Sequence, residues 1–179
     1  SLLAVLHDVV DDEQGHEILH RLVQRDDLAR STIYYTYYTF RTFQKLGRYA
    51  EGYRSRLYNW TEPLKLHAST WFESPEPSRS DCHAWGSWIM CDMLTTILGI
   101  TPAEPGFARV RVAPTPMDLD WARGSVPTVR GTACVAWRRD GRQYAADVVL
   151  PAGTEGEFVA PDGTAKALSP GANAVTFEA

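Results

Sequence analysis

The chain has 179 residues, and its hydrophobic content of 44% is enough to form a folded core, which excludes wholesale disorder. Its 18 basic and 22 acidic side chains give a net charge of −4, which argues against a protein that coats nucleic acid. No apolar run approaches the roughly 18 residues of a membrane-spanning helix, so we expect no membrane partner. The chain starts at Ser1 without a basic leader or cleavage site, so we expect no signal peptide and a processed or truncated piece.

Cysteine usage and motif content bear on redox state and cofactors. Cys82, Cys91 and Cys134 cannot all pair, and we expect three free thiols, which favours a reducing compartment such as the cytoplasm. Their spacing is not that of a metal site, and the chain has no phosphate-binding loop or nucleotide fingerprint. We therefore expect no cofactor.

Residues 1–104 have the pattern of helices. After Asp11 and Asp12, which can cap a helix, apolar residues recur at helical spacing through Val23. The other expected helices cover residues 31–47, where Gly47 is the stop signal, residues 48–57, and a stretch from Ser80 or Asp81 to Gly99. Four tyrosines in the second of these, Tyr34, Tyr35, Tyr37 and Tyr38, must point several ways, so only some can line a cavity.

Residues 105–179 change to short apolar runs separated by Pro and Gly, which predicts antiparallel β-structure. Asp140-Gly141 and Asp162-Gly163 are hairpin turn signals. The expected strands cover residues 107–112, 132–137, 144–150, 156–159 and 174–177. The fold class is therefore predicted to be α+β, with a helical part over 1–104 and a β-domain over 105–179.

The segment 59–86 lies between the expected helices and is long for an irregular connection, a feature typical of functional loops. Four of the six tryptophans fall within residues 60–88, together with acidic, guanidinium and imidazole side chains. Aromatic rings beside polar groups suit sugars, which present an apolar face and hydroxyls. Each tryptophan can equally be a core residue.

The run STWFESPEPSRSDCHAW, Ser69–Trp85, resembles the C-terminal part of the catalytic domain of bacterial α-L-rhamnosidases. The resemblance continues in LGI (98–100), PGF (105–107), LDWARG (119–124), PTVRG (127–131) and the Val135-x-Trp137 pair. It implies the closing helices of a six-hairpin (α/α) barrel followed by a small antiparallel β-sandwich, and inverting hydrolysis of terminal α-L-rhamnosides.

The resemblance also implies roles for single residues. Glu73 matches the family's general base, which takes a proton from the attacking water. The implied substrate-binding residues are Trp60, Trp71 and Trp85, which would stack on the sugar, and Arg79 and His83, which would bind its hydroxyls.

The family's general acid lies upstream of the matched region and has no counterpart in this chain. The isolated chain is therefore expected to be inactive, and its main partner is expected to be the remainder of its own catalytic domain. Helix faces that the missing helices would cover favour association, including homo-oligomers. The expected small-molecule partner is a rhamnose-containing glycoside.

Two other interpretations remain open. His16-Glu17-Ile18-Leu19-His20 matches H-E-x-x-H, the pattern of a zinc metalloprotease, but acidic and basic neighbours and the lack of a convincing third ligand argue against it. Alternatively, the β-domain is a non-catalytic carbohydrate-binding or structural module, with Trp121 and Trp137 as its tryptophans.

Overall fold

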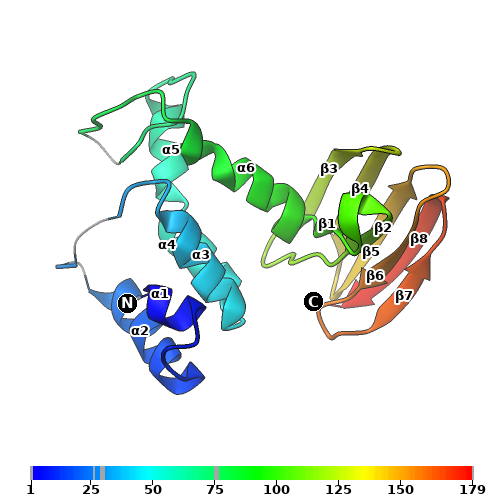
Figure 1. Cartoon of the computed structure of the whole chain (residues 1–179), viewed down its shortest axis with the longest axis horizontal. Coiled ribbons are helices and arrows are strands. Elements are labelled where there is room, and N and C mark those ends of the chain that lie inside the picture. Colours follow the sequence, from blue (N-terminus) through cyan, green and yellow to red (C-terminus); the bar gives the residue numbers. More distant parts are fainter. Residues whose placement is uncertain (1, 26, 29–30, 75–76, 179) are drawn as a thin grey trace. The chain divides into compact units, whose positions relative to one another are not determined.

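The protein is described by a computed structural model that covers residues 2–25, 27–28, 31–74 and 77–178. Helices make up the N-terminal part and strands the C-terminal part (Figure 1), which confirms the α+β class. The chain divides into two compact units, residues 1–89 and 90–179. The predicted boundary at residue 104 lies later, because the end of the last helix and the first strand pack with the β-unit.

Within its described residues, the helical unit contains five α-helices before its long loop. They are α1 (Leu2–Leu6), α2 (Asp12–Gln24), α3 (Thr36–Lys45), α4 (Tyr49–Arg56) and α5 (Tyr58–Lys65). The α2 prediction is confirmed, and the Asp11 side chain caps the helix by accepting from the Gln14 N–H at 2.8 Å. Helix α3 begins later than predicted, since residues 33–35 form a turn before it. The Ile33 N–H in this turn donates to the carbonyl of Glu73 at 2.8 Å.

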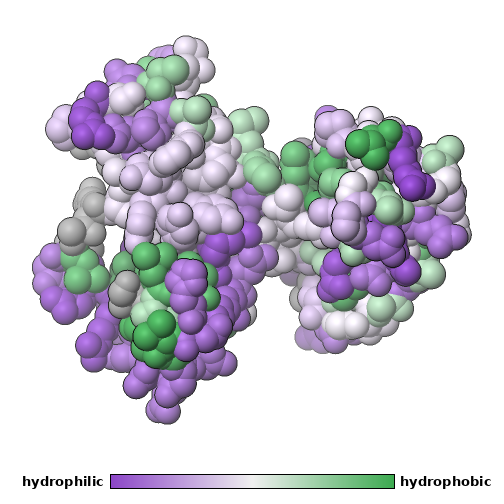
Figure 2. All heavy atoms as spheres, viewed as in Figure 1, coloured by the Kyte–Doolittle hydropathy of each residue, from purple (hydrophilic) through white to green (hydrophobic). Residues whose placement is uncertain are grey.

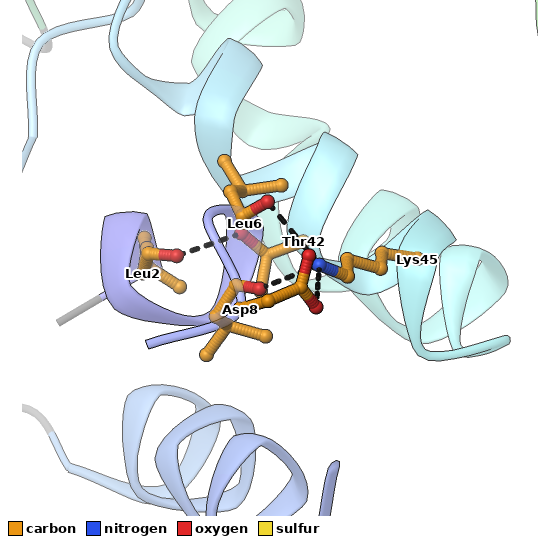
Figure 3. Close-up of polar contacts among 6 residues, drawn as sticks. Leu2, Leu6, Asp8, Thr42 and Lys45 are labelled. Atoms are coloured by element: carbon orange, nitrogen blue, oxygen red, sulfur yellow. Dashed lines mark hydrogen bonds and ion pairs between the residues drawn. The ribbon is translucent and has the colours of Figure 1, made fainter. Parts of the chain in front are cut away.

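Helix α1 was not predicted, and its position depends on α3. The Lys45 ammonium donates to the carbonyls of Val5 and Leu6 at 2.9 and 3.2 Å and pairs with Asp8 at 2.6 Å (Figure 3). A cation at the C-terminal end of a helix satisfies carbonyls that have no helical partner. This five-residue helix is therefore held by a contact from a residue far along the chain, which local sequence does not reveal.

The last helix was predicted to begin at Ser80 or Asp81, and this was wrong. A 3₁₀ turn covers Ala84–Ser87, α6 covers Trp88–Asp92 and a π-helical turn covers Met93–Ile97. The helix starts late because the preceding backbone is paired elsewhere: the carbonyl of Ser80 accepts from Glu73 and the N–H of His83 donates to Trp71. Its predicted end is confirmed, since Gly99 has φ +79°.

Two four-stranded sheets form the β-unit (Figure 1). The first has the order β1-β2-β6-β7 and the second the order β3-β4-β5-β8. The strand bounds are β1 Ile100–Pro102, β2 Arg109–Val112, β3 Trp121–Thr128, β4 Gly131–Asp140, β5 Gln143–Leu150, β6 Glu155–Val159, β7 Ala165–Leu168 and β8 Gly171–Glu178. Both hairpin predictions are confirmed, since β4 pairs with β5 and β6 with β7.

The β-unit departs from the prediction in one strand pairing and in three strands. The β2–β6 pair is parallel, so the all-antiparallel expectation was wrong for this pair. Strands β1 and β7, which have three and four residues, were not predicted. Strand β3 was not predicted either, because Gly124 and Pro127 interrupt its pattern. Its place at a sheet edge tolerates the proline, and the glycine allows close packing, since a Cβ there would lie 2.6 Å from the Leu98 side chain.

Aromatic rings connect the two sheets. Phe158 of β6 lies with its ring centroid 5.1 Å from that of Phe177 of β8, which stacks on Tyr144 at 5.2 Å. The neighbouring ring of Trp137 donates its indole N–H to the carbonyl of Ile97 at 3.3 Å. These contacts bury the inner faces of both sheets, and the burial of each such ring stabilises the fold by about 2 kcal/mol.

We predict that Gly99→Ala lowers the free energy of unfolding by about 3 kcal/mol or more. A Cβ at position 99 would lie 2.2 Å from the backbone carbon of Ala113, and φ is positive. The matched control is Gly141→Ala, where φ is +63° and a Cβ would meet nothing within 4 Å. That exchange should cost only about 1–2 kcal/mol. Urea unfolding curves measure the free energy of unfolding of both variants. Equal losses of stability would contradict the close approach of position 99 to the backbone of Ala113.

Candidate active site

The loop after α5 folds into a hairpin that holds the predicted general base. The Glu73 N–H donates to the carbonyl of Ser80 at 2.9 Å, and the His83 N–H donates to that of Trp71 at 2.8 Å. The carbonyl of Glu73 accepts from the Ile33 N–H at 2.8 Å, which ties the hairpin to the start of α3. Backbone bonds on both sides therefore fix the position of Glu73.

The Glu73 carboxylate is buried and is bound by Arg79. The Arg79 Nε donates to one carboxylate oxygen at 2.9 Å and Nη2 donates to the other. The two side chains differ sharply in exposure, at 8% for Glu73 and 83% for Arg79. A carboxylate that is shielded from water is thus paired with a guanidinium that is exposed to water. The two parallel hydrogen bonds are the geometry in which arginine binds carboxylates best.

This environment keeps Glu73 ionised. The hydrogen bond from Arg79 lowers the pKa of Glu73, burial opposes this effect, and the charges of Arg79 and His83 lower the pKa further. The pKa of Arg79 is raised in turn by its bond to Glu73. At neutral pH the carboxylate is therefore a proton acceptor, although a weaker base than an unperturbed glutamate.

A pocket of about 360 Å³ with an aromatic wall lies next to this hairpin. Its lining residues are Tyr34, Tyr37, Tyr38, Ala84, Trp85, Ser87 and Trp88. His83 connects the pocket to the carboxylate: its ring stacks on Tyr34 with centroids 5.6 Å apart, and its charge acts on Glu73. Trp85 contacts Tyr34 edge-on at 5.0 Å and is 66% exposed, so one of its faces is open to a ligand.

The structure brings together Glu73, Arg79, His83 and Trp85, but it places the other two predicted residues differently. Trp60 is buried, packs edge-on against Phe40 and Trp88, and donates its indole N–H to the carbonyl of Gly86 at 2.7 Å. Such a ring has no free face for a sugar, so we correct its role from stacking residue to core residue. Trp71 is half-buried at the base of the hairpin and is not among the residues that line the aromatic pocket.

Sequence reasoning missed Trp88 and left the tyrosines undecided. The aromatic spacing along 31–47 was the available signal, but which tyrosines face the pocket depends on where α3 begins. Tyr34, Tyr37 and Tyr38 line the aromatic pocket, whereas Tyr35 lines a second pocket of about 470 Å³ on the other side of α3. Asn59 lies in that second pocket, and its buried Oδ1 has no hydrogen-bond partner within the described part of the chain.

The H-E-x-x-H motif does not have the surroundings of a zinc site. His16 and His20 are exposed on α2, and Glu17 pairs with Arg21 at 2.7 Å instead of facing a metal. Over residues 2–25, 27–28, 31–74 and 77–178, no group of three or more His, Cys, Asp or Glu side chains gathers in a way that suits a metal ion. Cys82, Cys91 and Cys134 are free thiols, as predicted. None of the helices described is long and apolar enough to cross a membrane.

Comparison with known proteins identifies a family match in the C-terminal part of the chain. Residues 99–174 match the family described as "Bacterial alpha-L-rhamnosidase C-terminal domain". The resemblance to the C-terminal part of an α-L-rhamnosidase is confirmed. No curated protein matches the chain.

Solved α-L-rhamnosidases share the fold. The enzyme from Aspergillus terreus is 20% identical, with a TM-score of 0.84 over 98% of this chain and 23% of its own. The enzyme from Dictyoglumus thermophilum is 17% identical, with a TM-score of 0.81 over 99% of this chain and 25% of its own. The GH78 family rhamnosidase of Bacillus sp. GL1 is 24% identical, with a TM-score of 0.80 over 90% of this chain and 19% of its own. This chain therefore spans a quarter or less of the length of these structures.

We predict that the Glu73–Arg79 pair makes stability depend on pH. Because the pKa of Glu73 is lowered in the folded state, the pair stabilises the fold above the ordinary pKa of a glutamate, about 4.3. This contribution is lost as the pH falls through the lower folded-state value. Urea midpoints between pH 7 and pH 2 should therefore fall more steeply for the wild type than for Glu73→Gln. If the urea midpoints of both proteins changed equally with pH, the bond from Arg79 would not lower the pKa of Glu73.

Proposed function

We propose that this chain is the C-terminal part of a glycoside hydrolase that removes terminal α-L-rhamnose with inversion, and that Glu73 is its general base. The observation that carries the proposal is a buried, ionised carboxylate held beside an imidazole and an aromatic pocket. The motif order around Glu73 and the fold shared with α-L-rhamnosidases support the choice of sugar.

In the proposed reaction, Glu73 takes a proton from a water molecule while the water oxygen bonds to the anomeric carbon. The bond from that carbon to the aglycone oxygen breaks on the opposite face, and a second carboxyl group protonates the leaving oxygen. Inverting enzymes hold the two carboxyl groups about 6.5–9.5 Å apart to leave room for the water. Each Glu73 oxygen that accepts from Arg79 keeps a second lone pair, so water can still bind.

The general acid is proposed to lie in a part of the polypeptide beyond this chain. Residues 1–104 would then be the closing helices of an (α/α) barrel, with residues 105–179 as a β-sandwich. The leucines of α1, Leu2, Leu3 and Leu6, are only half-buried. Figure 2 shows an apolar area on the surface where Figure 1 places α1 and α2, and the remaining helices would cover such an area. On this proposal the isolated chain is inactive, because a lone base cannot protonate the aglycone.

The test of the base is turnover of an aryl α-L-rhamnoside by the full polypeptide that carries this chain. We expect Glu73→Gln to lower kcat by about 10²–10⁴-fold, because the amide cannot accept the proton of the water. The matched control is Glu17→Gln, which also removes a carboxylate from an arginine pair, but on the exposed surface of α2. It should leave kcat unchanged. Undiminished turnover by Glu73→Gln would disprove the assigned role, and an equal loss in Glu17→Gln would show that the effect is not specific to position 73.

A second candidate function is carbohydrate binding by the β-unit without catalysis. It is favoured by Trp121 at the start of the edge strand β3, whose side chain is 64% exposed. An exposed indole on a sheet can stack on a sugar ring.

Two tryptophan variants separate these candidates. We expect Trp85→Ala to raise KM for the rhamnoside about tenfold, since one lost stacking contact is worth about 1.4 kcal/mol. Trp121→Ala should leave KM unchanged. Steady-state kinetics and calorimetry with L-rhamnose measure both, and a loss of binding confined to Trp121→Ala would favour the β-unit instead.

A further inference from the structure

The Arg79–Glu73 pair differs from an ordinary surface ion pair in its asymmetry. In the Arg21–Glu17 pair of α2, both side chains are exposed, at 64% and 54%. Such pairs contribute little to stability because water screens them. Arg79 is even more exposed, at 83%, but is bonded to an acid whose side chain is only 8% exposed. The guanidinium therefore occupies the solvent side of the buried carboxylate.

The two bonds between these side chains restrict how the carboxylate can turn. Nε and Nη2 lie on one edge of the planar guanidinium, and each binds a different carboxylate oxygen. A carboxylate bound by two parallel bonds cannot rotate about its terminal torsion without breaking one of them. The backbone of Glu73 is held at both N–H and carbonyl, so the main chain and the carboxylate plane are fixed together.

The sugar-binding role expected for Arg79 fits this geometry poorly. Two of its donors are directed at Glu73. A hydroxyl that took over either of these donors would leave a buried carboxylate oxygen without its partner, and that loss is costly. The charge of Arg79 is thus already matched by a carboxylate of the same hairpin.

We propose that Arg79 is a positioning residue for Glu73, which fixes the plane of the carboxylate and keeps it in its proton-accepting form. The proposal rests on the proposed role of Glu73 as general base. Arg79 acts on the reaction through Glu73 and touches neither the sugar nor the water. The lone pairs that Arg79 leaves unused are then the ones presented to the attacking water.

Removal of the guanidinium should change the pH dependence as well as the rate. Among the residues that the structure describes, the charged and titratable groups that act on Glu73 are Arg79 and His83, and Tyr34 from the neighbouring segment acts on Arg79. Without Arg79, His83 is the one group of this described set that still opposes the effect of burial, so Glu73 binds its proton at higher pH. The acid limb of the kcat/KM profile, which reports the free base, should therefore move to higher pH.

The experiment compares Arg79→Gln, Arg79→Lys and the control Arg21→Gln in the full polypeptide with an aryl α-L-rhamnoside. We expect Arg79→Gln to lower kcat by about 10- to 100-fold with KM nearly unchanged, and to shift the acid limb to higher pH. Arg79→Lys keeps the positive charge but loses the planar group that donates two parallel hydrogen bonds. The acid limb of its pH profile should therefore stay near that of the wild type, while kcat falls. Arg21→Gln should match the wild type in both.

Rescue by guanidinium ion separates positioning from a folding defect. Because the Arg79 side chain is 83% exposed, the space that it vacates in Arg79→Ala is open to solvent. Millimolar guanidinium should restore part of kcat to Arg79→Ala and none to Glu73→Gln, whereas a misfolded variant would not respond to the ion.

The outcomes distinguish this proposal from the one on which it rests. If Glu73→Gln is inactive while Arg79→Gln keeps the rate and the pH profile of Arg21→Gln, then Arg79 is not a positioning residue and the base assignment stands. A rise in KM with unchanged kcat in Arg79→Gln would return Arg79 to the role of a sugar contact. Full turnover by Glu73→Gln would remove both proposals.

Discussion

The candidate site depends on the pairing of one buried carboxylate with one exposed guanidinium. Burial alone would raise the pKa of Glu73 and favour its neutral form, which cannot accept a proton. The bond from Arg79 outweighs that effect and lowers the pKa. The balance gives an ionised acid that is shielded from bulk water, and such a group can hold a single water molecule in a defined direction. In the proposed mechanism, the aromatic pocket and His83 can contribute only if this carboxylate is charged and correctly oriented.

The hairpin that carries the pair connects the site to the helical core. The backbone N–H groups of Glu73 and His83 bond the two sides of the hairpin to each other. The carbonyl of Glu73 also accepts from the Ile33 N–H, which lies just before α3. This connection holds the hairpin beside the turn that precedes α3, and Tyr34 of that turn lines the aromatic pocket. It also requires Gly86, where a Cβ would lie 2.8 Å from the Cβ of Trp71. The same backbone contacts of the hairpin thus determine both the packing of the loop and the geometry of the site.

Local signals predicted those parts of the fold that local interactions decide. Helix α2 follows from the cap at Asp11 and the spacing of its apolar residues, and the end of the last helix follows from Gly99. Where distant residues compete for the backbone, the prediction was incomplete: α1 depends on Lys45, and residues 80–83 pair with the hairpin instead of starting a helix. Strand β3 was hidden because its glycine and proline are tolerated by packing and edge position.

The residue types in the loop indicated a sugar site, but the structure was needed to assign a role to each residue. The family resemblance implied that Glu73 is the general base, and the structure adds that its carboxylate is buried and paired. The same resemblance implied that Trp60 and Arg79 contact the sugar, because the order of motifs does not show which side chains are buried or already paired. Burial assigns Trp60 to the core, and the two bonds to Glu73 direct Arg79 to the carboxylate.

The most direct measurement is the product that Glu73→Ala forms from an aryl α-L-rhamnoside in the presence of azide. If Glu73 normally deprotonates the attacking water, then its removal opens that face of the sugar, and the anion needs no base to attack there. The account predicts that azide restores turnover and that the product is the β-configured rhamnosyl azide. Absence of any response to azide, or formation of the α-configured azide, would contradict the assignment of Glu73 to the water side of an inverting site.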